Sequence, residues 1–425
     1  MLMKNKKKKL LIYAHYYVPD VASTGQLLCE LAEEMLDVFD ITIICTVPSY
    51  EGVVSAEYKK HKYYRENING VNVLRIRVPE FCKEKKMSRI RNIVSYFCGA
   101  MIATYKVGKQ DYVFSISQPP ILGGLLGVWG KWAKRAKFIY NIQDFNPEQV
   151  MAVNYSTSRI VTQIMLWCDK FSCRRSDLVI TVGRDLVQTM HNRFKNKRIP
   201  RTIMINNWTN ENTIYPLSKN DEKVIAFKNK YNMGDKFIFM YSGNIGLYYD
   251  LENIIKVIES FSSEIETKDG REVVFAFVGA GSLLNSLKEY VQTKKMDNVR
   301  FIPYQDKENL IYSLNAADVH WVVNAKGIKG VSCPSKYYGV AATGLPILGV
   351  LEGGSEIRML IEETNGGLIA DPQDYKKIKD NIQWFIDNAD TVETEEMGKR
   401  SRTYLVENLT KKVSVKKYIE AILEC

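Results

Sequence analysis

The chain has 425 residues, of which 46% are hydrophobic and 25% charged, with 26 Gly and 12 Pro. This composition is that of ordinary globular proteins and excludes a disordered, collagen-like or disulfide-stapled chain. The length is too great for one hydrophobic core and fits two domains of about 200 residues each. The 8 cysteines form no C-x-x-C pair, and the 4 histidines form no H-x-x-x-H pair or Cys/His cluster. We therefore expect reduced thiols and no structural zinc site.

Positive charge is concentrated in the first half of the chain. The net charge is +11, yet residues 1–205 alone hold 32 Lys and Arg against 17 Asp and Glu, so the remainder is slightly acidic. Such a basic half suits a phosphate-rich partner, which is an anionic membrane surface, a polyprenyl diphosphate or a nucleic acid. A solvated basic face without a partner explains the same charge.

Two short apolar stretches, 93–105 and 121–130, lie beside basic residues. Neither approaches the ~18–20 apolar residues that a membrane-spanning helix needs. The basic start of the chain also leads into too short an apolar run for a secretory signal. Short apolar helices with basic flanks are typical of segments that lie on a membrane. Core helices with basic ends are the alternative.

Short apolar runs alternate with amphipathic stretches along the first half of the chain. Their nearly continuous hydrophobicity is typical of strands buried on both faces of a parallel sheet. Strands are predicted at 10–15, 41–47, 71–78, 112–117, 138–142, 178–182 and 202–205, and helices at 25–36, 88–106, 158–174 and 185–194. This alternation predicts an α/β protein with a doubly wound sheet.

A polar stretch at 207–236 interrupts the alternation, which then begins again. Strands are predicted at 237–241, 273–278, 299–302, 319–323, 346–350 and 367–370, with helices at 251–261, 282–293, 307–316, 335–342 and 355–363. We predict two doubly wound, Rossmann-like domains, 1–207 and 208–400, and a helical segment, 401–425, that packs back on the first domain. Open α/β sheets bind ligands beyond the carboxyl ends of their strands, so a ligand in a central cleft is expected.

The first helix begins at a loop of small residues, Ser23, Thr24 and Gly25. The free backbone N–H groups and the positive dipole end of a helix start suit a phosphate or a sugar hydroxyl. Ser and Thr at such a position also act as simple N-caps.

Two glycine loops follow strands of the second half. Gly243 and Asn244 end one strand, where a glycine allows a ligand to approach the backbone closely. Gly279 and Gly281 end the next strand and lie beside a nucleobase or form a plain tight turn. Neither loop is a dinucleotide fingerprint, because Tyr249 stands where the third glycine belongs, and the sequence has no P-loop.

Pro334, Ser335 and Lys336 stand at the start of a predicted helix. Ser335 is placed to cap this helix, which puts Lys336 in its first turn. A lysine there opposes the helix dipole at a cost of a few tenths to ~1 kcal/mol. An anionic ligand neutralised by Lys336 and the helix amides explains this placement better than a solvent-exposed lysine.

Three carboxylates follow strands at places where sites gather in open sheets. Asp144 and Glu148 lie just past a strand of the first domain and either orient sugar hydroxyls, act as acid or base groups, or serve the fold alone. Glu356 follows Gly353 and Gly354 at a helix start and is either a cap or an acceptor for sugar hydroxyls.

In this order the motifs resemble those of the family 4 (group 1) glycosyltransferases, which are retaining enzymes of the GT-B type. The resemblance is to the branch found in O-antigen, capsule and exopolysaccharide clusters. It rests on the following segments: 17–19 with 25–26, 48–52, 143–144 with 147–148, 207–208, 242–246, 334–336, and Gly344 with Pro346.

The resemblance implies that the first domain binds the acceptor and the second a nucleoside-diphosphate sugar. It implies retention of the anomeric configuration, with no metal or other cofactor. It places 23–26 opposite the donor phosphates and sugar, Gly243 and Asn244 near the diphosphate with Lys336, and Glu356 near the transferred sugar.

The chain departs from the family pattern at several positions. The two glutamates of the E-x7-E signature fall on Val331 and Gly339, and the usual Arg and Lys fall on Asn244 and Tyr249. Lys336 is therefore the main candidate for the positive charge, with Lys326 or Lys329 as helpers.

Taken together, these features predict a metal-independent retaining glycosyltransferase. It would move a sugar from a nucleoside-diphosphate sugar, with UDP as the expected nucleotide, to a lipid-linked saccharide during surface polysaccharide biosynthesis. Asp144, Glu148 and Lys336 are the predicted catalytic residues. The protein would be cytoplasmic and peripheral, bound to the anionic inner face of the cell membrane, without a nucleic-acid partner. The alternative is a nucleotide-sugar epimerase or hydrolase of the same fold.

Overall fold

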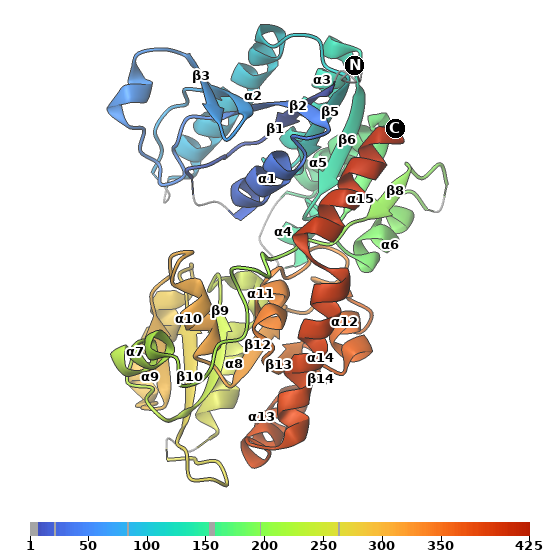
Figure 1. The fold of residues 1–425 in the computed structure, drawn as a ribbon. Coiled ribbons are helices and arrows are strands. Elements are labelled where there is room, and N and C mark those ends of the chain that lie inside the picture. Colours follow the sequence, from blue (N-terminus) through green and yellow to red (C-terminus); the bar gives the residue numbers. More distant parts are fainter. Residues whose placement is uncertain (1–6, 21–22, 83–84, 153–157, 196, 262–263) are drawn as a thin grey trace, which may run out of the picture.

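The structure is a computed structural model that describes residues 7–20, 23–82, 85–152, 158–195, 197–261 and 264–425. The chain forms two lobes, each built around its own sheet (Figure 1). Both sheets are dominated by parallel strands with helices packed on them, so the predicted α/β fold with two doubly wound lobes is confirmed.

The sheet of the first lobe has the order β3-β4-β2-β1-β5-β6-β7-β8. Its strands are β1 (Lys8–Tyr13), β2 (Phe39–Thr46), β3 (Tyr63–Ile68), β4 (Val71–Ile76), β5 (Tyr112–Ile116), β6 (Lys137–Ile142), β7 (Leu178–Thr181) and β8 (Thr202–Met204). All neighbours are parallel except β3 and β4, which pair antiparallel. The seven strands predicted in this half are confirmed, and β3 is an additional edge strand.

Helices cover both faces of this sheet. They are α1 (Ser23–Glu34), α2 (Lys86–Lys106), α3 (Leu122–Lys134), α4 (Glu148–Ala152), α5 (Arg159–Arg175) and α6 (Arg184–Arg193), with a short 3-10 helix, η1 (Ala56–Lys59). Along β1, Leu10 and Ile12 join the core under α1, while Leu11 and Tyr13 join the core under α2 and α3. Because alternate residues of a strand point to opposite faces, this burial on both sides explains the unbroken apolar run.

The second sheet is entirely parallel, in the order β11-β10-β9-β12-β13-β14. Its strands are β9 (Phe237–Ser242), β10 (Val273–Val278), β11 (Val299–Ile302), β12 (Val319–Val323), β13 (Ile347–Val350) and β14 (Gly367–Ala370). The helices are α7 (Glu222–Lys230), η2 (Leu247–Tyr249), α8 (Leu251–Glu259), α9 (Leu284–Lys294), α10 (Leu310–Asn315), α11 (Lys336–Thr343), α12 (Glu356–Thr364), α13 (Tyr375–Asp387), α14 (Val392–Asn408) and α15 (Lys411–Leu423). All six strands predicted for this half are present.

The last two helices belong to different lobes. Residue 400 lies inside α14, which packs on α11 of the second lobe and continues to Asn408. The chain then crosses over, and α15 buries Val415, Tyr418 and Ile422 in the core of the first lobe. Figure 1 shows α15 in red along the first lobe. The chain therefore passes between the lobes twice, after β8 and again after α14.

None of the 8 cysteines, all of which lie in described segments, forms a disulfide. Within the described ranges, no helix combines the length and hydrophobicity needed to cross a bilayer.

Candidate active site

A cavity of about 660 Å³ lies between the two lobes. Its first-lobe wall includes Thr24 at the start of α1, Gln118 after β5, and Gln143 and Asp144 after β6. The second-lobe wall is formed by residues that follow β9, β10, β11 and β12 and by the start of α11. The cavity thus lies beyond the carboxyl ends of both sheets, where open α/β sheets bind their ligands.

Lys336 is the first residue of α11, and its half-buried side chain lines this cavity. Its Nζ donates a hydrogen bond to Tyr241 Oη over 2.6 Å and lies 4.2 Å from the ring centroid of Tyr241 and 3.7 Å from that of Tyr249. Within the described residues, no carboxylate forms an ion pair with it. Burial lowers the pKa of Lys336 from 10.5 to about 7. The ammonium group is therefore poorly solvated and lacks a protein counter-ion, which favours an anionic ligand.

The other residues predicted around Lys336 differ in position. Ser335 lines the cavity and occupies the N-cap position of α11, but in the described structure its side chain makes no capping bond. The backbone N–H groups of Tyr337 and Tyr338 bond instead to the carbonyl oxygens of Pro334 and Ser335, over 3.3 and 3.2 Å. Lys326 and Lys329 do not line the cavity, and Lys329 Nζ is bound to the backbone oxygen of Gly353.

Gly243 and Gly279 bring two backbone segments into close contact under Lys336. A Cβ on Gly279 would lie 2.0 Å from the backbone oxygen of Gly243, and the φ of Gly279 is +139°. A Cβ on Gly243, whose φ is +148°, would lie 3.1 Å from Lys336 Cε. Only glycine fits this crowding and these backbone angles. Both residues line the cavity together with Asn244, whose backbone oxygen accepts a 2.6 Å hydrogen bond from Tyr241 Oη.

Gly281 does not line the cavity. A Cβ at this position would lie 2.1 Å from the backbone oxygen of Ile245, so this glycine is needed for packing between loops. Sequence analysis left two interpretations of this loop, contact with a nucleobase or a plain tight turn. The position of Gly281 agrees with the tight turn.

The residues at the start of α1 differ in position: one lines the cavity and another packs inside the lobe. Ser23 is the first residue of the helix. Thr24 lines the cavity, and its Oγ1 donates to Gln118 Oε1 over 2.8 Å. Gly25 packs against the backbone of Tyr16, where a Cβ would lie 3.0 Å from the carbonyl oxygen, and does not line the cavity.

Asp144 and Glu148, four residues apart, are separated by the fold. Asp144 lines the cavity and forms a β-bridge with Ser332 of the second lobe. Burial raises its pKa, and a side-chain hydrogen bond with Ser332 opposes that shift. Glu148 lies in the first turn of α4 and forms a bidentate ion pair with Arg193, at 2.5 and 2.7 Å. It does not line the cavity, so its surroundings are those of a structural carboxylate.

Glu356 lies at the joint between the lobes rather than in the cavity. It is 2% exposed, and its Oε2 accepts 2.8 Å hydrogen bonds from the backbone N and the Nε of Arg184, in the first lobe. Asp185 extends the joint by accepting a 2.8 Å hydrogen bond from the backbone N of Gly330. The predicted contact between Glu356 and the sugar is thus not part of the geometry of this cavity, whereas a role in fixing the angle between the lobes is.

Several cavity residues were missed at the sequence level. The sequence draws attention to Tyr249 only because it stands where a dinucleotide fingerprint has glycine and where the family has lysine. In the structure its ring forms one side of the Lys336 site. Gln118 and Tyr304 also line the cavity, each in a loop after a strand, a position that does signal a site in an open sheet.

Asn207 supplies a further polar group. It lines the cavity, and its Nδ2 donates to Gln143 Oε1 over 2.7 Å, whereas its buried Oδ1 has no partner among the described residues. Gln143 Nε2 in turn donates to Asn141 Oδ1, and Asn141 Nδ2 donates to Tyr418 Oη of α15, each over 2.7 Å. This chain of amides connects the cavity wall with the last helix.

Glu30, which also lines the cavity, connects the lobes. Its carboxylate accepts a 3.0 Å hydrogen bond from Lys307 Nζ of the second lobe and a 2.9 Å hydrogen bond from Trp208 Nε1. Two of the charged residues that line the cavity therefore neutralise each other, whereas Lys336 has no carboxylate partner in the described part of the chain. The arrangement can hold a polyanion against α11 and present polar groups from the opposite wall to a second, hydroxyl-bearing substrate.

Comparisons with known proteins agree with this geometry. Residues 222–404 match the family "Glycosyl transferases group 1". The chain is 25% identical to the probable glycosyltransferase WbjE of Pseudomonas aeruginosa over 349 residues, covering 81% of this chain and 82% of the relative. It is 23% identical to the putative colanic acid biosynthesis glycosyl transferase WcaI of Escherichia coli K12 over 368 residues, covering 84% and 87%.

The fold is also that of solved glycosyltransferases. The crystal structure of Anabaena Alr3699/HepE in complex with UDP and glucose superposes with a TM-score of 0.69 at 12% identity, covering 98% of this chain and 100% of the other. Residues 222–404 are thus similar to the group 1 glycosyltransferases, and the whole chain has the GT-B fold.

Proposed function

We propose that this glycosyltransferase moves a sugar from a UDP-sugar to a saccharide linked to a lipid carrier. The product would be part of a surface polysaccharide, and the reaction would take place at the inner face of the cell membrane. The anomeric configuration would be retained, and no metal ion would be needed.

The observation that supports this proposal most directly is the environment of Lys336. Loss of the sugar leaves additional negative charge on the departing diphosphate, and a catalyst must stabilise that charge. The Lys336 ammonium, which has no carboxylate partner among the described residues, and the positive dipole end of α11 provide a positive site in the same cavity. These groups would take the role that a divalent cation plays in other transferases.

The opposite wall suits the acceptor. Asp144 and Gln143 of the first lobe face the same cavity as Lys336. Holding an acceptor hydroxyl next to the anomeric carbon turns a bimolecular reaction into an effectively unimolecular one. Asp144 would orient this hydroxyl and attract its proton as the new bond forms.

The relatives support the chemical class of the substrates. The HepE structure contains UDP and glucose, and WcaI is named for colanic acid biosynthesis, which yields a polysaccharide. Both features agree with a sugar nucleotide as donor and a growing saccharide as acceptor.

The donor is identified first, with a panel of nucleotide sugars and their free nucleotides added to the purified protein. We expect UDP and at least one UDP-sugar to raise the melting temperature, with EDTA present throughout. Stabilisation by GDP- or dTDP-sugars alone would replace UDP in the proposal, and a requirement for added Mg²⁺ or Mn²⁺ would contradict metal independence.

The reaction class is then tested with the stabilising donor, with and without a lipid-linked acceptor. We expect turnover only with the acceptor, and NMR of the product should show the donor's anomeric configuration. Sugar release or epimerisation that proceeds equally without acceptor would favour a hydrolase or epimerase. An inverted product would overturn the retaining mechanism.

A further inference from the structure

The first lobe exposes an unusual number of large hydrophobic side chains on one group of helices. Just over half of the large hydrophobic residues exposed in the described chain lie on α2, α3, α4 and α5, which are a small part of the sequence. α2 packs against α3, and α3 packs against α5, so these three helices form one layer on the same face of the sheet.

On α2 the exposed residues form a stripe with helical spacing. Met87, Ile90, Val94, Ile102 and Tyr105 are 49–75% exposed, and they recur every three or four residues, or at a multiple of that spacing. Such spacing places them along one side of the helix. The opposite side of α2 is the one that packs on the sheet, through Tyr96 and Ala100.

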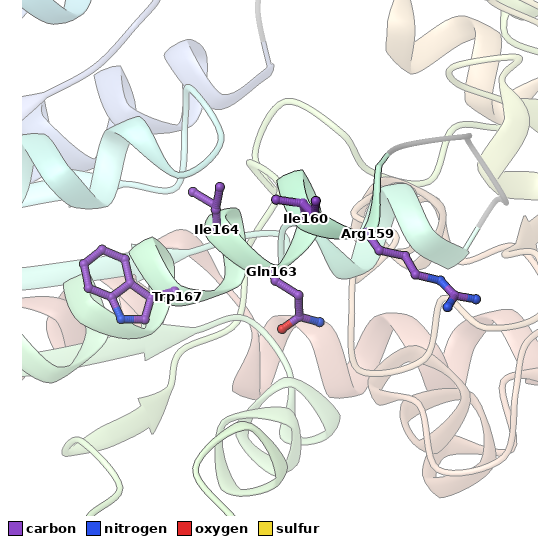
Figure 2. A pocket seen from close by; sticks show the side chains of 5 residues that line it. All are labelled: Arg159, Ile160, Gln163, Ile164 and Trp167. Atoms are coloured by element: carbon purple, nitrogen blue, oxygen red, sulfur yellow. The ribbon is translucent and has the colours of Figure 1, made fainter.

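On α5 the exposed residues surround a shallow hollow. This hollow has a volume of about 400 Å³ and is lined by Arg159, Ile160, Gln163, Ile164 and Trp167, which all project from the same helix (Figure 2). Ile160 is 72% exposed, Ile164 56% and Trp167 66%. Large apolar side chains exposed side by side, rather than singly, are typical of interaction surfaces.

Aromatic side chains connect α5 with α3. The Trp167 ring stacks on Phe171 with 6.0 Å between centroids, and Trp132 of α3, 55% exposed, contacts Phe171 edge to face at 6.2 Å. Tryptophan is the side chain that most favours the boundary between water and the lipid headgroups, because its ring is apolar and its N–H is polar.

The charges on these helices are of one sign. α2 and α3 contain no Asp or Glu, and the single acidic residue of α5, Asp169, is 3% exposed and bound to Arg193 and Tyr140. The basic residues of α2 and α5 are more numerous: Lys86, Arg89, Arg91 and Lys106 on α2, and Arg159, Lys170, Arg174 and Arg175 on α5. Two copies of this face would repel each other, whereas an anionic surface would attract it.

From these observations we infer that the outer face of α2, α3 and α5 docks on a bilayer surface that contains anionic lipids. The apolar side chains enter the interface between headgroups and acyl chains, and the basic residues contact the headgroups. This inference rests on the proposed function, to which it adds the surface that brings the enzyme to a lipid-linked acceptor.

Helix α4, which precedes α5 in the chain, lies beside the cleft. In the short helix α4, Gln149 lines the cavity between the lobes, while Met151, two residues later, is 54% exposed. A protein docked through α2 and α5 would therefore hold the first-lobe wall of the cleft close to the membrane. An acceptor could then reach Asp144 without its lipid leaving the bilayer.

The test uses the full chain and sedimentation with vesicles, without donor or acceptor. One set contains phosphatidylcholine and phosphatidylglycerol in equal amounts, and the other phosphatidylcholine alone. We expect binding to the anionic vesicles that weakens as salt is added. The double variant I160E/W167E should bind at least about tenfold more weakly, because two apolar anchors are lost and two negative charges gained.

Two further variants serve as comparisons. V392E adds one negative charge at an apolar residue of α14 that is 76% exposed, and it should bind like the unmodified protein. R91E, on the exposed side of α2, should weaken binding to anionic vesicles but change little with neutral ones. Melting curves should confirm that each variant is folded, which their exposure favours.

Equal binding by I160E/W167E and the unmodified protein, or no binding at low salt, would overturn the inference. So would a dimer in light scattering that I160E/W167E dissociates, because the face would then be covered by a second copy. UDP affinity is measured in parallel and should not change in the variants. A protein that binds vesicles but not UDP would contradict the proposed donor, and one that binds UDP but not vesicles would contradict the docking surface alone.

Discussion

The two walls of the cleft differ in the chemical groups that they present to a ligand. At Gly243 and Gly279 the second-lobe wall presents backbone that is packed without space for side chains, and Lys336 lies above these glycines. The first-lobe wall consists of polar side chains, among them Thr24, Gln118 and Asp144. Backbone amides and a fixed ammonium suit the diphosphate, which all donors of one class share, whereas side chains can vary with the acceptor.

This difference predicts how each wall tolerates change. Substitutions in the second wall should affect every donor alike and often affect folding, because backbone contacts cannot be adjusted. Substitutions in the first wall should alter turnover and acceptor preference while the protein remains folded. The following experiments test this contrast.

Lys336→Ala should have the largest effect. Loss of a fixed positive group at the departing diphosphate should lower turnover at least tenfold, and about a hundredfold if it equals the loss of one preorganised donor. Steady-state kinetics with a UDP-sugar measures this effect, and melting curves verify the fold. Lys326→Ala is the matched control, since that exposed lysine does not line the cavity, and it should react at the unmodified rate. Near-normal turnover of Lys336→Ala would remove this residue from the mechanism.

Gly279→Ala should destabilise the second lobe by about 2–3 kcal/mol, because it combines an unfavourable φ with a steric clash. Gly270 is a suitable comparison, since its φ is +85° but a Cβ there would have nothing within 4 Å. Gly270→Ala should therefore cost only about 1 kcal/mol, the strain alone. Denaturant unfolding of both variants separates the two contributions. Equal losses would mean that the contact with Gly243 relaxes freely.

The pH dependence of donor binding should identify Lys336 directly. Burial lowers its pKa to about 7 in the free protein, and the charged form binds the diphosphate. UDP binding should then take up a proton above pH 7, and affinity should fall about fivefold between pH 7 and 8, as the charged fraction decreases. Calorimetry in buffers of different ionisation enthalpy measures the proton uptake. The proposed linkage fails if this uptake persists in Lys336→Ala.

Asp144 and Glu148 should separate catalysis from stability. Asp144→Asn should lower turnover about tenfold and leave stability nearly unchanged, because it removes a charge that faces the cavity. Glu148→Gln should lower stability by about 1–3 kcal/mol, because it breaks the ion pair with the buried Arg193, and should leave turnover of the folded enzyme unchanged. Steady-state kinetics and unfolding curves are measured for both variants. Lost turnover in Glu148→Gln together with lost stability in Asp144→Asn would assign the catalytic role to Glu148 instead.

The joint between the walls gives the smallest expected effect. Arg184 also pairs with Glu363, but these two side chains are 40% and 43% exposed. Glu363→Ala should therefore change stability by no more than about 0.5 kcal/mol. Glu356→Gln, which alters the buried partner of the same arginine, should cost several times more. Similar values in unfolding experiments would show that burial does not govern this joint.

Most of the fold could be predicted because strands buried on both faces have an unbroken apolar pattern. Strand β3, Tyr63–Ile68, was missed because it lies at the sheet edge, where its alternating half-buried and exposed residues leave no such pattern. Lys336 was found because a lysine at a helix start is electrostatically unfavourable. The two aromatic rings beside it could not be predicted, since Tyr241 of β9 and Tyr249 of η2 come nearly a hundred residues earlier in the chain.

The carboxylates predicted as site residues show what the sequence could not decide. Asp144 and Glu148 have the same chemistry and nearly the same position in the chain, yet one faces the cavity and the other faces Arg193. That difference depends on α4 and on the distant helix α6, which carries the arginine. Glu356 is similar, because its partner Arg184 belongs to the other lobe.

The return of α15 to the first lobe has a consequence for folding. Tyr418 belongs to the core of that lobe and accepts a hydrogen bond from Asn141, 277 positions earlier, in the series of amides that leads to Asn207 in the cleft. Residues 1–207 therefore do not contain the whole core of their own lobe, and without α15 they would leave an apolar groove open and Asn141 without this partner.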